Sequence, residues 1–164
     1  MKTLLLLRHA KSSHEDESLR DFDRPLNERG IGDAKLIGDL IRKKKIKLDL
    51  IVGSPAERAR QTADLALKSA RLKVEMKFDK RIYDASPGVL VKVLSQIKDT
   101  SNTVMLVGHN PGFEELLESL TGEAPTLPTA SLACIDLDVD QWNKVRAGSG
   151  HLKYRVTPRE LKDQ

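Results

Sequence analysis

Arginine and histidine side chains stand at two points of this sequence where a short apolar run gives way to polar residues. Arg8 and His9 directly follow the apolar run 4–7, and His109 follows a second run at 104–107. A run of this length is too short for a helix and predicts a buried strand of a parallel sheet. Because ligands bind beyond the carboxyl ends of such strands, the two histidines are expected to face one crevice.

Arg58 is the second arginine expected at this crevice, because it lies in the first turn of a helix that follows another predicted strand. An arginine presents a fixed fork of donors that suits a tetrahedral oxyanion, and two arginines can hold three phosphoryl oxygens. Arg8 and Arg58 therefore predict a phosphate clamp. The alternative is that Arg58 pairs with Glu57 or Asp64 on the surface of its own helix.

A neutral histidine has a free lone pair on one ring nitrogen and can act as a nucleophile, since its ordinary pKa is about 6.5. His9 could attack phosphorus while His109 donates a hydrogen bond to the developing charge. The product would be a phosphohistidine that water then hydrolyses. Two structural alternatives stay open: His9 could cap its strand, and His109 could merely order its Gly-His-Asn-Pro turn.

The elements that must position these side chains alternate apolar runs with amphipathic segments, which is typical of βαβ units on a parallel sheet. Strands are predicted at 4–7, 48–52, 72–78, 103–107, 131–137 and 152–157. The 72–78 strand alternates apolar and polar residues, so it is expected to be half-exposed or near an edge. An antiparallel arrangement is open for the last two strands. Helices are predicted from about 27, over 56–69, from 87 and over 113–120.

The helix ends carry their own signals. Asn27 is the expected N-cap of the first helix, and Ser86 caps the third with Pro87 at its first position. The spacing assigns the inner face of the first helix to Ile31, Ala34, Ile37, Leu40 and Ile41.

The polar loop 11–25 is too long for a simple connector, and loops of this kind are usually functional or mobile. Arg24 in this loop could approach the crevice. Pairing with Asp21 or Asp23 is the stronger expectation for it.

Length and composition indicate one compact domain, residues 1–164, with 39% apolar and 32% charged residues. The N-terminal apolar run stops at Arg8, which is too short for a signal-peptide core, so a cytoplasmic location and no membrane partner are expected. Cys134 is the single cysteine, which excludes an internal disulfide and a cysteine-rich zinc site, and its strand-like surroundings predict a buried thiol. No cofactor or metal motif is visible.

The formal net charge of +4 does not by itself indicate a nucleic-acid partner. Much of the excess lies at 42–45 and Lys47, at the end of a predicted helix, where cations suit the helix dipole and face water. Aromatic residues make up 4% of the chain and do not interleave with this run. No nucleic-acid partner is therefore expected.

Three motifs in this order carry a resemblance to a known family. They are Leu7-Arg8-His9-Ala10, Ser54-Pro55-Ala56-Glu57-Arg58-Ala59-Arg60-Gln61-Thr62 and Val107-Gly108-His109-Asn110-Pro111. The chain resembles the histidine phosphatase superfamily, the phosphoglycerate mutase-like proteins, and in particular its small SixA-type phosphohistidine phosphatases, to which segment 21–30 is also similar. The resemblance implies an α/β fold, a three-layer αβα sandwich with a mostly parallel central sheet.

The same resemblance implies that His9 is the phosphorylated nucleophile, that Arg8, Arg58 and His109 complete the phosphate pocket, and that the reaction needs no metal. Larger members protonate the leaving group with a carboxylate, for which Asp84 is the candidate here. The SixA-type branch can lack that acid, since a phosphorylated imidazole can be protonated by solvent. Residues 11–15 depart from the mutase pattern, and the chain lacks the long insertions that roof mutase pockets.

An unroofed pocket favours a protein substrate, so the expected activity is hydrolysis of phosphohistidine on a phosphoprotein. One alternative is a broad phosphomonoesterase for small phosphate esters, which would require Asp84 as a proton donor. A second alternative is a phosphoprotein-binding module without turnover. The intact His9 argues against that module, because a binder needs no nucleophile.

Overall fold

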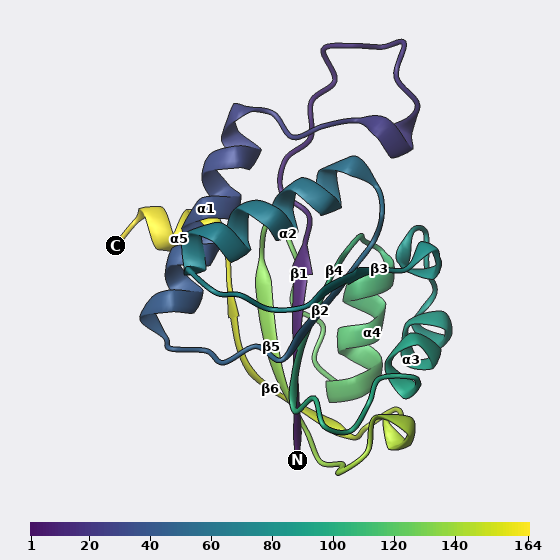
Figure 1. Cartoon of the computed structure of the whole chain (residues 1–164). Helices are drawn as coiled ribbons and strands as arrows, with labels where there is room; N and C mark the ends of the chain where they lie inside the picture. Colours follow the sequence, from purple (N-terminus) through teal and green to yellow (C-terminus); the bar gives the residue numbers. More distant parts are fainter.

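A computed structural model describes residues 1–164 and contains one sheet of six strands, in the order β3-β2-β4-β1-β5-β6 (Figure 1). The strands are β1 (Lys2–Arg8), β2 (Leu50–Gly53), β3 (Met76–Phe78), β4 (Thr103–Gly108), β5 (Leu132–Leu137) and β6 (Gly150–Val156). Strands β1 to β4 pair in parallel, whereas β5 pairs antiparallel with both β1 and β6. The mostly parallel sheet is confirmed, and the last two strands are antiparallel.

Helices cover both faces of this sheet and give the three layers that the resemblance implied. Figure 1 shows α1 (Glu28–Lys43), α2 (Glu57–Ala70) and α5 (Pro158–Lys162) on one side, and α3 (Pro87–Ser95) and α4 (Gly112–Thr121) on the other. Short 3-10 turns occur at Asp21–Asp23, Lys80–Ile82 and Trp142–Lys144. None of the helices combines the length and apolar character that a bilayer crossing requires.

The central strand β1 explains why the first apolar run is continuous rather than alternating. Leu5 and Leu7 pack into the core beneath α1 and α2, while Leu4 and Leu6 pack into the core beneath α3 and α4. All four side chains are fully buried. A strand covered on both faces needs apolar residues at every position.

The predicted helix caps are confirmed, because Asn27 accepts from the main-chain N–H of Gly30 and Ser86 from that of Val89. The assignment of Ile31 to the inner face of α1 is wrong, since Ile31 is 37% exposed. The buried face passes through Gly30 and Gly38 instead, where the helix backbone approaches its neighbours closely.

The predicted 72–78 strand is shorter in the structure, because only Met76–Phe78 pairs with β2. This strand lies at the edge of the sheet, as expected.

Cys134 is buried on β5, which confirms the expected buried thiol.

Candidate active site

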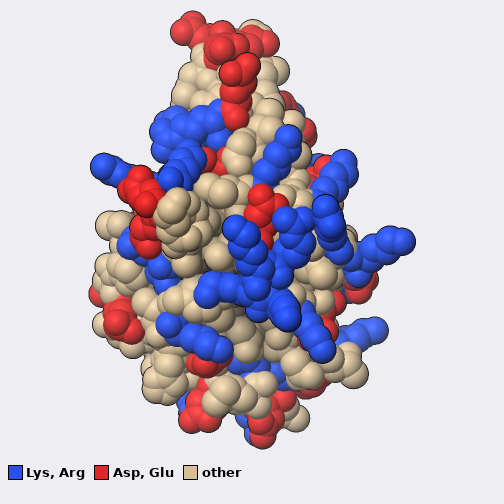
Figure 2. Space-filling view, turned by 90° about the vertical axis from the view of Figure 1, so that its left-hand side faces the viewer, with Lys and Arg blue, Asp and Glu red and all other residues tan.

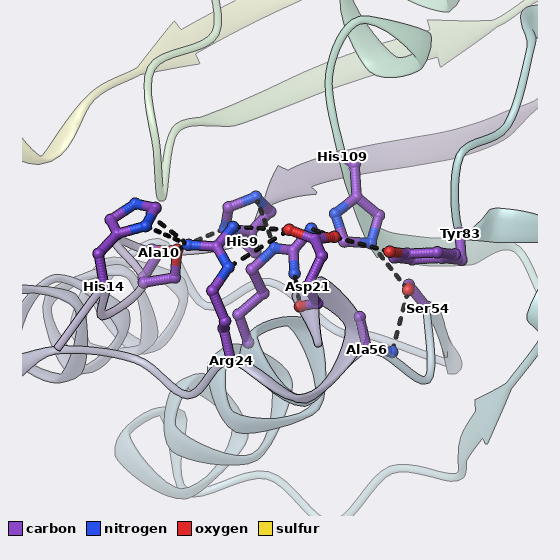
Figure 3. Close-up of polar contacts among 11 residues, drawn as sticks. His9, Ala10, His14, Asp21, Arg24, Ser54, Ala56, Tyr83 and His109 are labelled. Atoms are coloured by element: carbon purple, nitrogen blue, oxygen red, sulfur yellow. Dashed lines mark hydrogen bonds and ion pairs between the residues drawn. The ribbon is translucent and has the colours of Figure 1, made fainter. Parts of the chain in front are cut away.

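The parallel strands β1, β2 and β4 end side by side and bring the predicted histidines and arginines to one place. Arg8 at the end of β1 lies opposite Gly108 at the end of β4. Two main-chain bonds continue this alignment beyond the sheet: His9 N–H donates to Gly108 O at 2.9 Å, and Ser54 N–H donates to Val107 O at 2.9 Å. The order of the strands thus positions side chains that are far apart in sequence (Figure 3).

His9 is buried and its two ring nitrogens have different surroundings. Nδ1 lies 2.7 Å from the carbonyl oxygen of Ala10, so Nδ1 carries the proton and donates it. Nε2 then holds a lone pair, toward which Nε–H of Arg58 points at 3.4 Å. Burial, together with the nearby arginines, lowers the pKa of His9 to about 4. At neutral pH the ring is therefore uncharged.

His109 faces His9 with 5.1 Å between the ring centroids. Its Nε2 lies 2.8 Å from the hydroxyl oxygen of Ser54, which also accepts from the main-chain N–H of Ala56. The Ser54 hydroxyl can therefore donate to Nε2, which leaves the proton on Nδ1. That Nδ1 atom is buried and has no partner in the chain. Burial lowers the pKa of His109 to about 3, with His9 and Arg58 adding to the effect.

The two predicted arginines both reach this site. Arg8 donates through Nη1 to the carbonyl oxygen of Leu127 at 2.9 Å, while its buried Nε has no partner. Arg58 is 6% exposed and does not form the surface ion pairs left open by the sequence. Asp64, one of those possible partners, pairs with Lys68 instead. An oxyanion between the histidines would therefore meet donors from both arginines.

An unpredicted carboxylate, that of Asp21, binds the outer edge of Arg58. Its Oδ2 accepts from Arg58 Nη2 at 3.0 Å, and its main-chain oxygen accepts from Arg58 Nη1 at 2.7 Å. Arg24 donates to Oδ1 at 2.8 Å, which is one of the two pairings expected for Arg24. Asp21 thus ties the long loop 11–25 to the first turn of α2.

Tyr83 holds the same carboxylate from the other side of the site (Figure 3). Its hydroxyl donates to Asp21 Oδ2 at 2.6 Å, and its ring lies edge-on to His109. The Tyr83 and Arg24 bonds, with Arg58, hold the pKa of Asp21 far below its usual range. Asp21 is consequently ionised at any pH near neutral.

A cavity of about 280 Å³ opens beside Arg58 and His109 and includes the predicted acid, whereas His9 and Arg8 do not line it. Its lining consists of Asp21, Arg58, Tyr83, Asp84, His109 and Asn110. Asp84 is exposed, forms no side-chain hydrogen bond, and adopts a left-handed backbone conformation with φ of 56°. The structure therefore brings Asp84 to the mouth of the pocket.

Ser54 and Tyr83 were not assigned a role from the sequence, and Asp21 was expected only as a partner of Arg24, not of Arg58. Ser54 could have been found, because it is the first polar residue after a buried strand and points to the same edge as the histidines. The contact of Asp21 with Tyr83 and Arg58 gave no signal of spacing, since Asp21 and Tyr83 each lie in a loop whose path depends on tertiary contacts.

Known proteins show what this chain is similar to. A family model described as the histidine phosphatase superfamily (branch 1) matches residues 4–102, which is more than half of the chain. The chain belongs to the histidine phosphatase superfamily. An uncharacterized protein of Mycobacterium tuberculosis is 31% identical to this histidine phosphatase over 164 residues, covering 93% of this chain and 100% of its own.

Solved structures place the chain in the SixA-type branch of this superfamily. A candidate phosphohistidine phosphatase SixA from Agrobacterium tumefaciens is 30% identical, with a TM-score of 0.81, and the match covers 96% of this chain and 98% of that protein. The protein histidine phosphatase SixA complexed with tungstate shares the fold, with a TM-score of 0.85 at 21% identity, over 97% of this chain and 99% of its own. The likeness to these proteins supports a phosphatase activity for this chain.

Proposed function

We propose that this histidine phosphatase hydrolyses phosphohistidine on a protein, through a covalent phosphohistidine formed on His9 and without a metal ion. The observation that carries the proposal is the state of His9, which is neutral, has its proton on Nδ1 toward Ala10, and directs the Nε2 lone pair toward Arg58, a residue that lines the pocket. The SixA-type relatives add support, because their names give the same substrate class.

In the first step, Nε2 of His9 forms a bond to phosphorus while the P–N bond of the substrate breaks. The electron pair of that bond stays on the leaving ring nitrogen, and the imidazole leaves neutral because its other nitrogen carries a proton. Arg8 and Arg58 neutralise the phosphoryl oxygens, and Nδ1–H of His109 donates to one of them. The carbonyl of Ala10 holds the Nδ1 proton of His9 as the ring becomes cationic.

In the second step, the oxygen of a water molecule forms a bond to phosphorus and the P–Nε2 bond breaks. Its electron pair returns to Nε2, and dihydrogen phosphate leaves with both protons of the water. His9 is neutral again, with its proton still on Nδ1. The low pKa of this residue favours its return to the neutral form.

The leaving-group side of the pocket suits a nitrogen-linked phosphoryl group. Asp21 is ionised and cannot donate a proton. An imidazole that already carries its proton needs no such donor, whereas an alkoxide does. Asp84, which also lines the pocket, favours a second candidate function, a phosphomonoesterase for small phosphate esters.

The test compares His9→Asn with His151→Asn, because His151 is an exposed histidine on β6 away from the site. The substrates are a protein phosphorylated on histidine and a generic aryl phosphate. His9→Asn should lose turnover of both, and His151→Asn should retain it. Acid-labile, base-stable phosphate should be trapped on the wild-type enzyme only when His9 is present. Turnover by His9→Asn at the wild-type rate would overturn the proposal.

A further inference from the structure

The carboxylate of Asp21 occupies donors of Arg58 that a phosphoryl group requires. Nη2 of Arg58 is bonded to Oδ2 of Asp21 at 3.0 Å, and Nη1 is bonded to its main-chain oxygen at 2.7 Å. Carboxylates and phosphoryl groups present similar pairs of oxygens to a guanidinium. The outer edge of Arg58 is therefore bound to an internal anion.

This contact is built from several elements rather than from one flexible side chain. Tyr83 after the 3-10 turn Lys80–Ile82 and Arg24 in the loop both donate to the Asp21 carboxylate. The base of the loop is fixed by the bridge between Ser12 and Leu26. The Asp21 side chain is nevertheless 53% exposed, whereas that of Arg58 is 8% exposed. Asp21 can therefore move outward into solvent while Arg58 stays in place.

We propose that Asp21 is an internal competitor that must leave Arg58 before a phosphoryl group can bind. The proposal rests on the proposed function only in assigning Arg58 to the phosphoryl group. Because the bound state of Asp21 reduces the fraction of protein that is competent to bind, it weakens the apparent affinity for every oxyanion. The contact between Asp21 and Arg58 thus lowers the apparent affinity of the pocket for phosphoryl groups.

The test measures tungstate binding by calorimetry, a readout that does not depend on turnover. Asp21→Asn should bind tungstate about three to ten times more tightly than wild type, as expected for loss of a partly exposed ion pair. Tyr83→Phe should shift the affinity in the same direction by less. Asp23→Asn is the matched control, because Asp23 lies in the same turn, carries the same charge and pairs with Arg20 instead.

Two results would overturn the competitor role. Equal tightening by Asp21→Asn and Asp23→Asn would show a general charge effect only. Weaker tungstate binding by Asp21→Asn would show that the carboxylate positions Arg58 for the ligand. Neither result depends on whether phosphohistidine is the substrate, which the His9 variants decide separately.

A second cavity, of about 500 Å³, lies at the opposite end of the sheet from the histidines. It is lined by Thr3, Leu5, Lys44, Lys45, Ile46, Lys47, Thr103, Cys134, Lys153 and Tyr154. Thr3 and Arg8 stand near opposite ends of β1, so the Thr3 end of this cavity is roughly 17 Å from the phosphate clamp at 3.3 Å per residue. A ligand here would not be the reacting phosphoryl group.

Four lysines and no carboxylate line this cavity. None of the four forms an ion pair, whereas Lys68 pairs with Asp64 and Lys162 with Asp33. The dipole of α1 favours cations at its carboxyl end, near Lys44. That effect does not explain Lys153, which comes from β6 on the other side of the cavity.

The same face of the molecule is basic beyond the cavity. Figure 2 looks at the side where α1, α5 and the edge strand β6 lie in Figure 1, and Lys and Arg side chains gather over its middle. Within the cavity, Lys44 lies 4.3 Å from the centre of the Tyr154 ring, and Thr3 pairs in register with Thr103. Ammonium groups, hydroxyl groups and an aromatic ring are therefore available to one ligand.

We infer that this cavity binds a small molecule with two or more phosphate groups. Its volume lies in the range of small-molecule sites, and lysines bind phosphates as point charges. A concave site of this size fits a compact polyanion better than an extended polymer. The inference is independent of the reaction at His9.

The probe for this site is inorganic tripolyphosphate, titrated into protein whose clamp is saturated with tungstate. Wild type should bind one equivalent, and Lys44→Ala/Lys153→Ala should weaken that binding about tenfold or more, as loss of two charge-assisted contacts predicts. The matched control Lys68→Ala/Lys77→Ala removes the same charge elsewhere and should leave binding unchanged.

Equal weakening by both double variants would indicate non-specific attraction and overturn the site. Absence of binding to wild type would overturn it as well. If a single-stranded oligonucleotide bound the same lysines more than tenfold more tightly than tripolyphosphate, the ligand would be a polymer and the small-molecule assignment would be wrong.

Discussion

Nε of Arg58 lies 3.4 Å from Nε2 of His9, so the guanidinium faces the lone pair of the proposed nucleophile. The same arginine lies 6% exposed in the first turn of α2. Burial disfavours protonation of the ring and lowers the pKa of His9, and a fixed positive charge at this distance acts in the same direction. Arg58 therefore adds to the effect of burial in keeping His9 neutral, and it also supplies donors to an oxyanion.

Arg58→Lys should lower kcat/KM by about 100-fold or more, because a lysine retains the charge but not the fork of donors. Steady-state kinetics on the histidine-phosphorylated protein measure the effect. Arg60→Lys is the control on the same helix, since Arg60 is exposed and stacks on Phe78. Activity of Arg58→Lys within threefold of wild type would contradict the clamp.

The two buried histidines should make folding stability depend on pH. Their pKa values are lowered to about 4 in His9 and about 3 in His109, whereas the unfolded chain titrates them near 6.5. Between these values the unfolded state binds more protons, so stability falls as pH falls from 6.5 toward 4. The loss attributable to His9 alone is on the order of 3 kcal/mol.

Urea denaturation at pH 7, 6, 5 and 4 measures this dependence. The variant His9→Asn/His109→Asn should have a clearly shallower slope, because carboxylates titrate equally in both proteins. Parallel curves for the variant and wild type would mean that the histidines are not held neutral by the fold.

The core of the site was predictable because it depends on strand ends. Apolar runs at 4–7 and 104–107 had to become buried strands, and parallel strands deliver the residues at their carboxyl ends to one edge. Arg8, His9 and His109 were found for this reason. The prediction of each of these residues needed only the local apolar pattern of the sequence and a general rule of α/β topology.

Asp21 and Ile31 show the limits of the local pattern. Asp21 reaches Arg58 and Tyr83, which are 37 and 62 residues away, and no spacing rule connects a loop carboxylate to them. Ile31 is exposed because α1 packs through glycines, which an apolar-spacing rule does not count. Both errors come from tertiary contacts between backbone or loop and distant residues.

Asp84→Asn separates the two candidate substrates. Asparagine tolerates the left-handed conformation of this residue, so the fold should be retained. Turnover of phosphohistidine should stay within about twofold of wild type, since an imidazole that carries its proton leaves without an enzyme acid. If Asp84→Asn lowered turnover of alkyl phosphates by 100-fold or more and lowered turnover of phosphohistidine by a similar factor, the small-ester phosphomonoesterase would be favoured.

Gly30→Ala and Gly32→Ala should change stability in opposite directions, although both replace a glycine in the first two turns of α1. A Cβ at Gly30 would lie 2.1 Å from the carbonyl oxygen of Lys11, whereas nothing lies within 4 Å of a Cβ at Gly32. Lys11 O accepts from Asn27 N–H at 3.0 Å, so Gly30→Ala must disturb this bond as well.

Gly30→Ala is therefore expected to destabilise the protein by about 1 to 3 kcal/mol, the usual cost of an overpacked site. It should also lower turnover, because Lys11 lies two residues beyond His9 and its displacement moves the Ala10 carbonyl that holds Nδ1. Gly32→Ala should stabilise by about 0.5 to 1 kcal/mol through helix propensity and leave turnover unchanged. Chemical denaturation measures the stability of both variants, and steady-state kinetics measure their turnover. If both variants were more stable than wild type, α1 would not pack tightly against the main chain of Lys11.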